Sequence, residues 1–280
     1  MSAGKIIITT LIIATALVLS GLLTGCESKS EKTEIQVFVA ASLKRPMEEI
    51  AAGYNEQHPN VAIVYNIDGS GKLMTQIEEG YSCDVFFSAS AEQMNRLEED
   101  NLLIDGTRSN VVNNQLVVIS RRDSNTAVTG LSNLNEAESI AIAGGSVPAG
   151  GYTRRALINI GVLSDTDDVS EITTAEMSDA LGGVEISEQD NVSKVLTAVA
   201  EGSCEVGTTY LSDTYGYEDE LNIIEIVPYD LTGNVIYPVS RVKNDDATDE
   251  ENSTADDFIE YILSDEARSI FEKYYFDTNI

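Results

Sequence analysis

Strand-like and helix-like segments alternate along most of this chain, and that alternation limits the folds open to it. Runs of β-branched and apolar residues are followed by segments in which apolar residues recur three or four positions apart, as with Val192, Val195 and Val199. Parallel strands need such a crossover between them, so the pattern predicts an α/β fold with mostly parallel sheets. The strand-like runs are residues 34–40, 61–65, 84–88, 116–120, 139–143, 206–210, 223–227 and 235–242.

The N-terminal segment predicts export from the cytoplasm. Lys5 precedes an apolar run over residues 6–23, and small residues lead to Cys26. This is the order of a secretory signal, and small residues before a cysteine resemble a bacterial lipobox, which directs cleavage before Cys26 and lipidation of its sulfur. We interpret residues 1–25 as a lipoprotein signal peptide and residues 26–33 as a polar tether. An uncleaved transmembrane anchor is the alternative, because the run is about long enough to span a bilayer. Both interpretations put the following residues outside the cytoplasm.

The remaining length predicts two lobes. Removal of residues 1–25 from the 280-residue chain leaves 255 residues, which is enough for two modest lobes and too many for one simple core. Two apolar helical faces, at residues 258–263 and 270–274, follow one another at the end of the chain, and we expect these helices to pack back onto the first lobe. Residues 244–254 are polar and acidic, and we expect a flexible loop there.

The charge balance excludes one class of partner. The chain has 17 Lys and Arg against 47 Asp and Glu, which gives a formal net charge of -30. Nucleic-acid binding requires clustered basic residues, so nucleic acid is not expected as a partner. An acidic surface keeps a tethered protein soluble, but it does not identify a ligand.

Four segments share a pattern in which a strand ends, a small or hydroxyl residue follows and a helix begins. They are residues 40–43, 69–71, 147–151 and 190–192, and in the first of them Ser42 is expected at the N-cap. Helix N-termini offer unpaired N–H groups and a partial positive charge, and ligands of open α/β sheets gather at the carboxyl ends of strands. The pattern therefore suggests an anion site. Ordinary helix caps and turns would give the same pattern, and the residues alone leave both interpretations open.

The same segments, with others in order along the chain, resemble periplasmic molybdate-binding proteins of ABC transporters. The resemblance implies a two-lobe fold with a mostly parallel, helix-flanked sheet in each lobe and two crossovers, near residues 112–116 and 233–237. Lobe I would then hold residues 34–114 and 236–280, and lobe II residues 115–235. The matching segments are residues 37–43, 69–73, 84–89, 147–150 with Tyr152, 207–210 with Ser212 and Asp213, 237–239, and 270–274 with Phe276.

This resemblance also implies a ligand and a set of neutral donors for it. The ligand would be molybdate or tungstate, with no cofactor and no direct ligand to a metal cation. The partner would be an ABC transporter permease, and the protein a monomer anchored by lipid on the outer face of the cell membrane. The implied donors are the hydroxyls of Ser42, Ser70 and Tyr210 and the backbone N–H groups of Ala149 and Val192.

Basic side chains and cysteines near these segments receive other roles. Lys72, Arg154 and Arg155 lie next to the proposed loops, but we expect them to point along the polar faces of their helices without touching the ligand. Cys83 and Cys204 would lie in different lobes on the implied map. We therefore expect two buried thiols rather than a disulfide, although a disulfide is possible outside the cytoplasm.

Three other functions compete with this interpretation. An enzyme is disfavoured because His58 is the single histidine, no G-x-S-x-G motif is present, and residues 66–73 lack the first Gly and the final Ser or Thr of a phosphate loop. A metal-ion receptor is disfavoured because one His and scattered carboxylates make a poor transition-metal site, although loose surface Ca²⁺ binding is left open. A binding protein for sulfate, phosphate or an organic acid is the third alternative.

Overall fold

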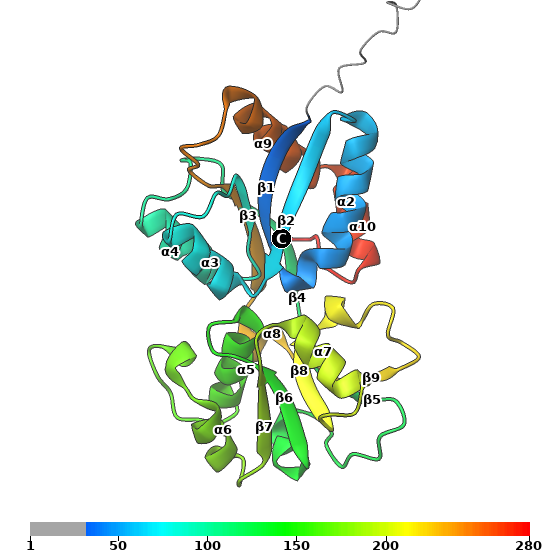
Figure 1. The fold of residues 1–280 in the computed structure, drawn as a ribbon. Helices are drawn as coiled ribbons and strands as arrows, with labels where there is room; N and C mark the ends of the chain where they lie inside the picture. Colours follow the sequence, from blue (N-terminus) through cyan, green and yellow to red (C-terminus); the bar gives the residue numbers. More distant parts are fainter. Residues whose placement is uncertain (1–31) are drawn as a thin grey trace, which may run out of the picture. The chain divides into compact units, whose positions relative to one another are not determined.

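The computed structural model describes residues 32–280, whose strands form two separate sheets (Figure 1). The predicted signal peptide, the lipidation site at Cys26 and nearly all of the predicted tether lie outside the described residues. The first strand begins at Thr33, one residue before the predicted start.

The two sheets have the same design of five strands each. The first has the order β2-β1-β3-β10-β4, and the second the order β7-β6-β8-β5-β9. β10 runs antiparallel to β3 and β4, and β5 runs antiparallel to β8 and β9, while the other pairs are parallel. Each sheet is therefore mixed, with two parallel and two antiparallel strand pairs, although four of its five strands run in the same direction, which is the sense in which the predicted parallel character holds. The strands are β1 (Thr33–Ala40), β2 (Val61–Asp68), β3 (Val85–Phe87), β4 (Ser109–Asn114), β5 (Leu116–Arg121), β6 (Ser139–Ala143), β7 (Glu185–Gln189), β8 (Val206–Tyr210), β9 (Leu221–Ile226) and β10 (Val235–Arg241).

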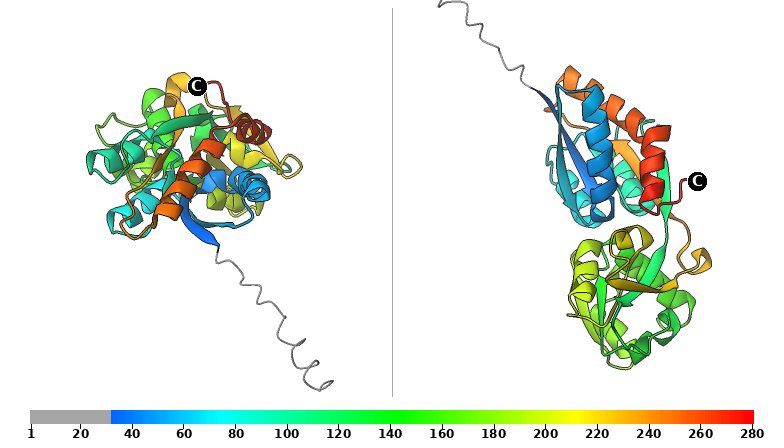
Figure 2. Two further views of the ribbon diagram at one scale, coloured as in Figure 1. Left: turned by 90° about the horizontal axis from the view of Figure 1, so that it is seen from above. Right: turned by 90° about the vertical axis from the view of Figure 1, so that its right-hand side faces the viewer.

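Each sheet and the helices packed on it form a lobe. Lobe I is the first sheet with α2, α3, α4, α9 and α10, and lobe II is the second sheet with α5, α6, α7 and α8 (Figures 1 and 2). The α-helices are α2 (Lys44–Gln57), α3 (Ser70–Glu78), α4 (Ala91–Glu99), α5 (Pro148–Asn159), α6 (Thr174–Ala180), α7 (Val192–Ala200), α8 (Tyr229–Thr232), α9 (Asp249–Ile262) and α10 (Asp265–Lys273). Four short 3-10 turns are η1 (Ala41–Leu43), η2 (Leu131–Glu136), η3 (Val169–Glu171) and η4 (Leu211–Thr214).

The described chain passes between the lobes twice. β4 ends at Asn114 in the first sheet and β5 begins at Leu116 in the second, so Gln115 alone separates them. The return path leaves β9, passes through α8 and enters β10. The first path leads into β5 of the second sheet. The return path leads into β10, which lies between β3 and β4 in the first sheet.

Glycines follow the ends of three helices. Gly80, Gly161 and Gly202 follow the C-caps of α3, α5 and α7, with φ angles of 85°, 79° and 75°. That left-handed conformation is accessible to glycine without the steric cost that a Cβ would add. Each of these glycines therefore lets the chain turn away from its helix.

The predicted flexible loop at residues 244–254 is wrong in its second half. Helix α9 begins at Asp249, and Thr248 caps it: the Thr248 Oγ1 accepts from Glu251 N at 3.2 Å, while the Glu251 carboxylate accepts from Thr248 N at 2.7 Å. Three acidic residues in the first turn also favour the positive end of the helix dipole. The acidic run is therefore the start of a helix rather than a loop.

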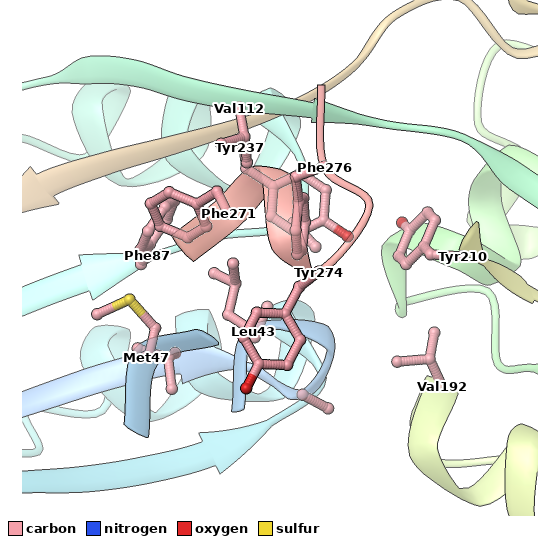
Figure 3. Packing of buried hydrophobic residues seen from close by; sticks show 14 of the residues in the cluster. Leu43, Met47, Phe87, Val112, Val192, Tyr210, Tyr237, Phe271, Tyr274 and Phe276 are labelled. Atoms are coloured by element: carbon pink, nitrogen blue, oxygen red, sulfur yellow. The ribbon is translucent and has the colours of Figure 1, made fainter. Parts of the chain in front are cut away.

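The two C-terminal helices pack on lobe I, as predicted. α9 lies against β1 and α10 against α2, where the Lys273 ammonium is 2.7 Å from the Glu49 carboxylate. Beneath them, the main apolar cluster runs from Met47 and Phe271 in lobe I to Tyr210 and Val192 in lobe II (Figure 3). Apolar packing is thus continuous from one lobe to the other.

Both cysteines of the described chain are free and buried, as expected. Cys83 belongs to a cluster in lobe I with Leu73 and Phe86, whereas Cys204 belongs to the main cluster. Burial raises the pKa of both thiols, most strongly at Cys83. Both side chains therefore behave as small apolar groups.

Candidate functional site

A small cavity lies where the starts of four helical segments meet, and residues of both lobes line it. All five predicted donors, Ser42, Ser70, Ala149, Val192 and Tyr210, are among the lining residues. The cavity volume is ≈ 10 Å³, about the room that one water molecule needs. A polyatomic ion would therefore require the lining side chains to move aside. The lining residues are Ala40, Ala41, Ser42, Gly69, Ser70, Ala89, Val147, Pro148, Ala149, Asn191, Val192 and Tyr210.

Ser42 reaches the cavity from a 3-10 turn rather than from the N-cap that the sequence suggested. It lies inside η1, whose N-cap is Ala40, and its hydroxyl caps no backbone group. Its Oγ lies 2.9 Å from the Tyr237 Oη, and both side chains are buried. The expected capping role is wrong, because a side-chain partner holds this hydroxyl at the edge of the cavity.

Ser70 is the first residue of α3, and its hydroxyl is also held from behind. Its Oγ accepts a hydrogen bond from Ala89 N at 2.9 Å, and the residue is 1% exposed. A hydroxyl that accepts one bond still has its own proton to donate. Ser70 can therefore offer an O–H group to a ligand in the cavity.

Lobe II contributes two helix starts. Val147 is the N-cap of α5 and Pro148 its first residue, which puts Ala149 in the first turn. Asn191 is the N-cap of α7, and its Oδ1 accepts from Lys194 N at 3.1 Å, so Val192 opens the helix. N–H groups in a first turn have no acceptor within their own helix. The predicted helix starts are correct, and both lie at the cavity.

Tyr210, at the end of β8, has a buried hydroxyl with no hydrogen-bond partner in the described chain. Burial raises its pKa well above the usual value, and the nearby Tyr237 hydroxyl adds to this effect. The ring centroids are 5.8 Å apart, and Figure 3 shows Tyr210 and Val192 facing the lobe I side chains. An unsatisfied buried hydroxyl costs about 1–3 kcal/mol, so this group is suited to a ligand that accepts a hydrogen bond.

The backbone of Tyr210 is fixed by a half-buried carboxylate that the sequence did not identify as part of the site. Asp213 Oδ2 accepts from the Thr209 hydroxyl at 2.7 Å and from Tyr210 N at 3.1 Å. Burial raises the pKa of Asp213 to about 6, despite these two bonds, which lower it. Asp213 does not line the cavity, so its role here is to orient Tyr210.

The basic residues considered from the sequence do not line the cavity. The Lys72 ammonium pairs with Asp68 at 2.5 Å, and the Arg155 guanidinium pairs with Asp165 at 3.2 Å. All the lining residues are neutral. The electrostatic attraction available to an anion therefore comes from N–H and O–H dipoles at short range.

Arg154 departs from the expected position along a polar helix face. Its side chain is 1% exposed and donates to the carbonyls of Ile172, Ala143 and Gly150 at 2.9–3.1 Å. Burial lowers its pKa, although Glu188 at 3.8 Å acts in the opposite direction. Arg154 satisfies carbonyl groups beneath the start of α5, which is a structural role within lobe II.

Two features that residues 32–280 lack bear on other functions. No group of three or more His, Cys, Asp or Glu side chains in this range is arranged to hold a metal ion. Within the same range, no helix combines the length and apolar character needed to cross a membrane.

The similarity of this chain to known proteins covers the whole site. A family model described as a bacterial extracellular solute-binding protein matches residues 35–277. YvgL of Bacillus subtilis, provisionally named an ABC transporter substrate-binding lipoprotein, is 30% identical over 262 residues, which are 91% of this chain and 93% of YvgL. The molybdate-binding protein ModA of Haemophilus influenzae is 28% identical over 270 residues, with 94% of this chain and 96% of ModA covered.

A solved structure gives the same result in three dimensions. The substrate-binding domain of a provisionally assigned molybdenum ABC transporter from Clostridium difficile is 32% identical to this chain, with a TM-score of 0.62. The likeness covers 88% of this chain and 99% of that domain. The similarity therefore includes both sheets and both paths between them.

Proposed function

The chain belongs to the bacterial extracellular solute-binding protein family and is a binding protein rather than an enzyme, and we propose that its solute is molybdate or tungstate. The family is extracellular, so the two lobes lie outside the cytoplasm. The relatives named for molybdate and molybdenum favour this solute over other small molecules. The protein would act as a monomer without a cofactor and pass the ion to an ABC transporter permease.

The observation that carries this proposal is the set of donors around one neutral cavity. Two serine hydroxyls, two helix starts and the unpartnered Tyr210 hydroxyl come from both lobes, and the lining residues carry no carboxylate. A fully ionised tetrahedral oxyanion has only acceptors, so each of its oxygens can be paired there. A hydrogen phosphate ion would bring a proton that needs an acceptor.

Calorimetry of the purified protein with a panel of anions tests this proposal. Molybdate and tungstate should bind far more tightly than sulfate, hydrogen phosphate or a small carboxylic acid. Tight binding of one of the other anions would identify that anion as the solute instead. No binding of any oxyanion would overturn the proposed function.

We also propose that a lipid on Cys26 holds the protein at the membrane, consistent with the lipoprotein name of YvgL. Cys26 lies outside the described residues, so the proposal depends on the lipobox-like sequence before it. Mass spectrometry of the mature N-terminus should find a diacylglyceryl cysteine at Cys26, and Cys26→Ser should release the protein from the membrane. An intact N-terminus beginning at residue 1 would instead indicate an uncleaved anchor.

A further inference from the structure

A chain of buried hydrogen bonds leads from the two crossover paths to the Ser42 hydroxyl. Asn114 Nδ2 donates to the Tyr237 Oη at 3.1 Å and to the Ser212 Oγ at 2.8 Å, and the Tyr237 Oη lies 2.9 Å from the Ser42 Oγ. All four residues are at most 7% exposed. Asn114 ends β4, Tyr237 lies in β10, and Ser212 belongs to lobe II.

The donor and acceptor roles in this chain of hydrogen bonds follow from Asn114, the residue at its start. The Asn114 Oδ1 accepts from Gln115 N at 2.9 Å, which directs its Nδ2 toward Tyr237 and Ser212. The Tyr237 oxygen accepts the amide hydrogen, so its own proton is available to the Ser42 oxygen. Ser42 then has its proton left to donate into the cavity.

We propose that Tyr237 and Asn114 are positioning residues, which act through Ser42 by holding its hydroxyl as a donor toward the bound ion. This inference rests on the proposed oxyanion function. Tyr237 does not line the cavity, so it would affect ligand choice without touching the ligand. An ion with only acceptors suits a fixed donor, whereas a protonated ion would find no acceptor at Ser42.

The second serine of lobe I supplies an internal contrast. The Ser70 Oγ accepts from a backbone group, Ala89 N, and a side-chain substitution cannot remove that partner. The Ser42 hydroxyl depends instead on two side chains from distant parts of the sequence. Tyr237, 195 positions away, contacts it directly, and Asn114, 72 positions away, acts through Tyr237. Ser42 is therefore the donor whose orientation a single mutation can release.

A double-mutant cycle in the full chain tests the proposal, with Tyr237→Phe, Ser42→Ala and the pair together. Tyr237→Phe should weaken molybdate binding by roughly 3- to 10-fold, the range expected for loss of an ordinary hydrogen bond. In the Ser42→Ala background the same change should have less than about a twofold effect. Tyr54→Phe is the control. It removes a buried, unpartnered hydroxyl of lobe I that does not belong to this chain of hydrogen bonds, so the affinity for molybdate should be unchanged.

Ligand preference gives a readout that a purely structural role would not move. Sulfate carries no proton, whereas hydrogen phosphate carries one. The affinity for each can be measured by competition with molybdate. Freed from Tyr237, the Ser42 hydroxyl can turn and accept, so Tyr237→Phe should raise the affinity for hydrogen phosphate relative to sulfate. If Tyr237→Phe lacks a cooperative thermal transition, Asn114→Leu removes the preceding donor and should shift the preference in the same direction.

Two results would overturn the inference: wild-type affinity and preference in Tyr237→Phe, or an equal loss in the wild-type and Ser42→Ala backgrounds. Failure of the proposed function is distinguishable from both. In that case the wild-type protein would bind no oxyanion at all.

Discussion

Replacing Gly71 with alanine would insert a methyl group between the lobes beside the proposed ion site. Gly71 lies in the first turn of α3, and a Cβ built there would be 2.2 Å from the backbone oxygen of Ser146 in lobe II. Real Cβ atoms essentially never approach closer than 3.0 Å, so the gap must widen by at least 0.8 Å (3.0 − 2.2). The obstacle is a backbone carbonyl, which cannot rotate away as a side chain would.

The expected loss of affinity follows from how far hydrogen bonds can stretch. Donors from both lobes must reach one ion, and a bond of about 2.9 Å lengthened by 0.8 Å exceeds the usual limit of about 3.2 Å. Loss of one bond to a charged ligand costs about 1.5–3 kcal/mol, so molybdate binding should weaken by roughly 10- to 150-fold. The unliganded protein should not lose stability, because alanine is the better helix former by up to about 1 kcal/mol.

Calorimetry and small-angle scattering would measure the two effects separately. Gly71→Ala should bind molybdate weakly and show less compaction on adding the ion than the wild type, while its thermal midpoint without ligand stays equal or rises. Gly151→Ala is the matched control. It is also a helical glycine beside the cleft, but its Cβ would meet no atom closer than 3.8 Å.

Wild-type affinity in Gly71→Ala would refute this reasoning. It would mean that the lobes of the bound protein stand farther apart than in the present structure, by enough to admit the methyl group. A loss of affinity in Gly151→Ala as large as that in Gly71→Ala would instead implicate helix rigidity rather than contact between the lobes.

Three further predictions concern side chains at and near the site. Ser70→Ala and Tyr210→Phe each remove one hydroxyl donor to the proposed ion, so each should weaken molybdate binding by roughly 10- to 150-fold in calorimetry; wild-type affinity in both would contradict the assignment. Lys72→Ala and Arg155→Ala remove cations already paired with carboxylates, so each should change affinity by less than about fivefold; abolished binding in either folded variant would indicate a direct ion pair. The pKa of Asp213, raised from 3.8 to about 6, makes the folded state hold its proton more tightly, so this stabilisation is complete below pH 4 and is lost as the pH rises through 6. Asp213→Asn should therefore flatten the fall in thermal midpoint between pH 4 and pH 6, and parallel curves for the two proteins would contradict the raised pKa.

Local signals predicted the helix boundaries that bear on the site. Each of the starts at Ser70, Pro148 and Val192 follows a strand through a short polar or small-residue link, and three helices end at glycines with positive φ. Such signals act over a few residues, so a sequence contains all that is needed to recognise them. The start of α9 was missed although Thr248 and Glu251 form a capping box, because the acidic run around them suggested a solvated loop.

Edge strands and long-range partners could not be predicted in the same way. β4 (Ser109–Asn114) and β7 (Glu185–Gln189) lie at the ends of their sheets and are mostly polar, so they lack the apolar runs that marked the other strands. The partner of the Ser42 hydroxyl lies 195 residues away, at Tyr237. No local pattern indicates such a pairing, because only the return of β10 to the first sheet brings the two together.

The position of β10 in the first sheet sets an order of assembly. Lobe II has all its strands within one continuous stretch, Leu116 to Ile226, so its sheet can form as soon as that stretch is available. The first sheet instead needs β10 between β3 and β4, and β10 is separated from β4 by all of lobe II. Closing so long a loop is slow. As the chain emerges on the outer side of the membrane, β3 and β4 therefore lack the strand that joins them until β10, which ends at Arg241, has arrived, and lobe II can fold before the first sheet is complete.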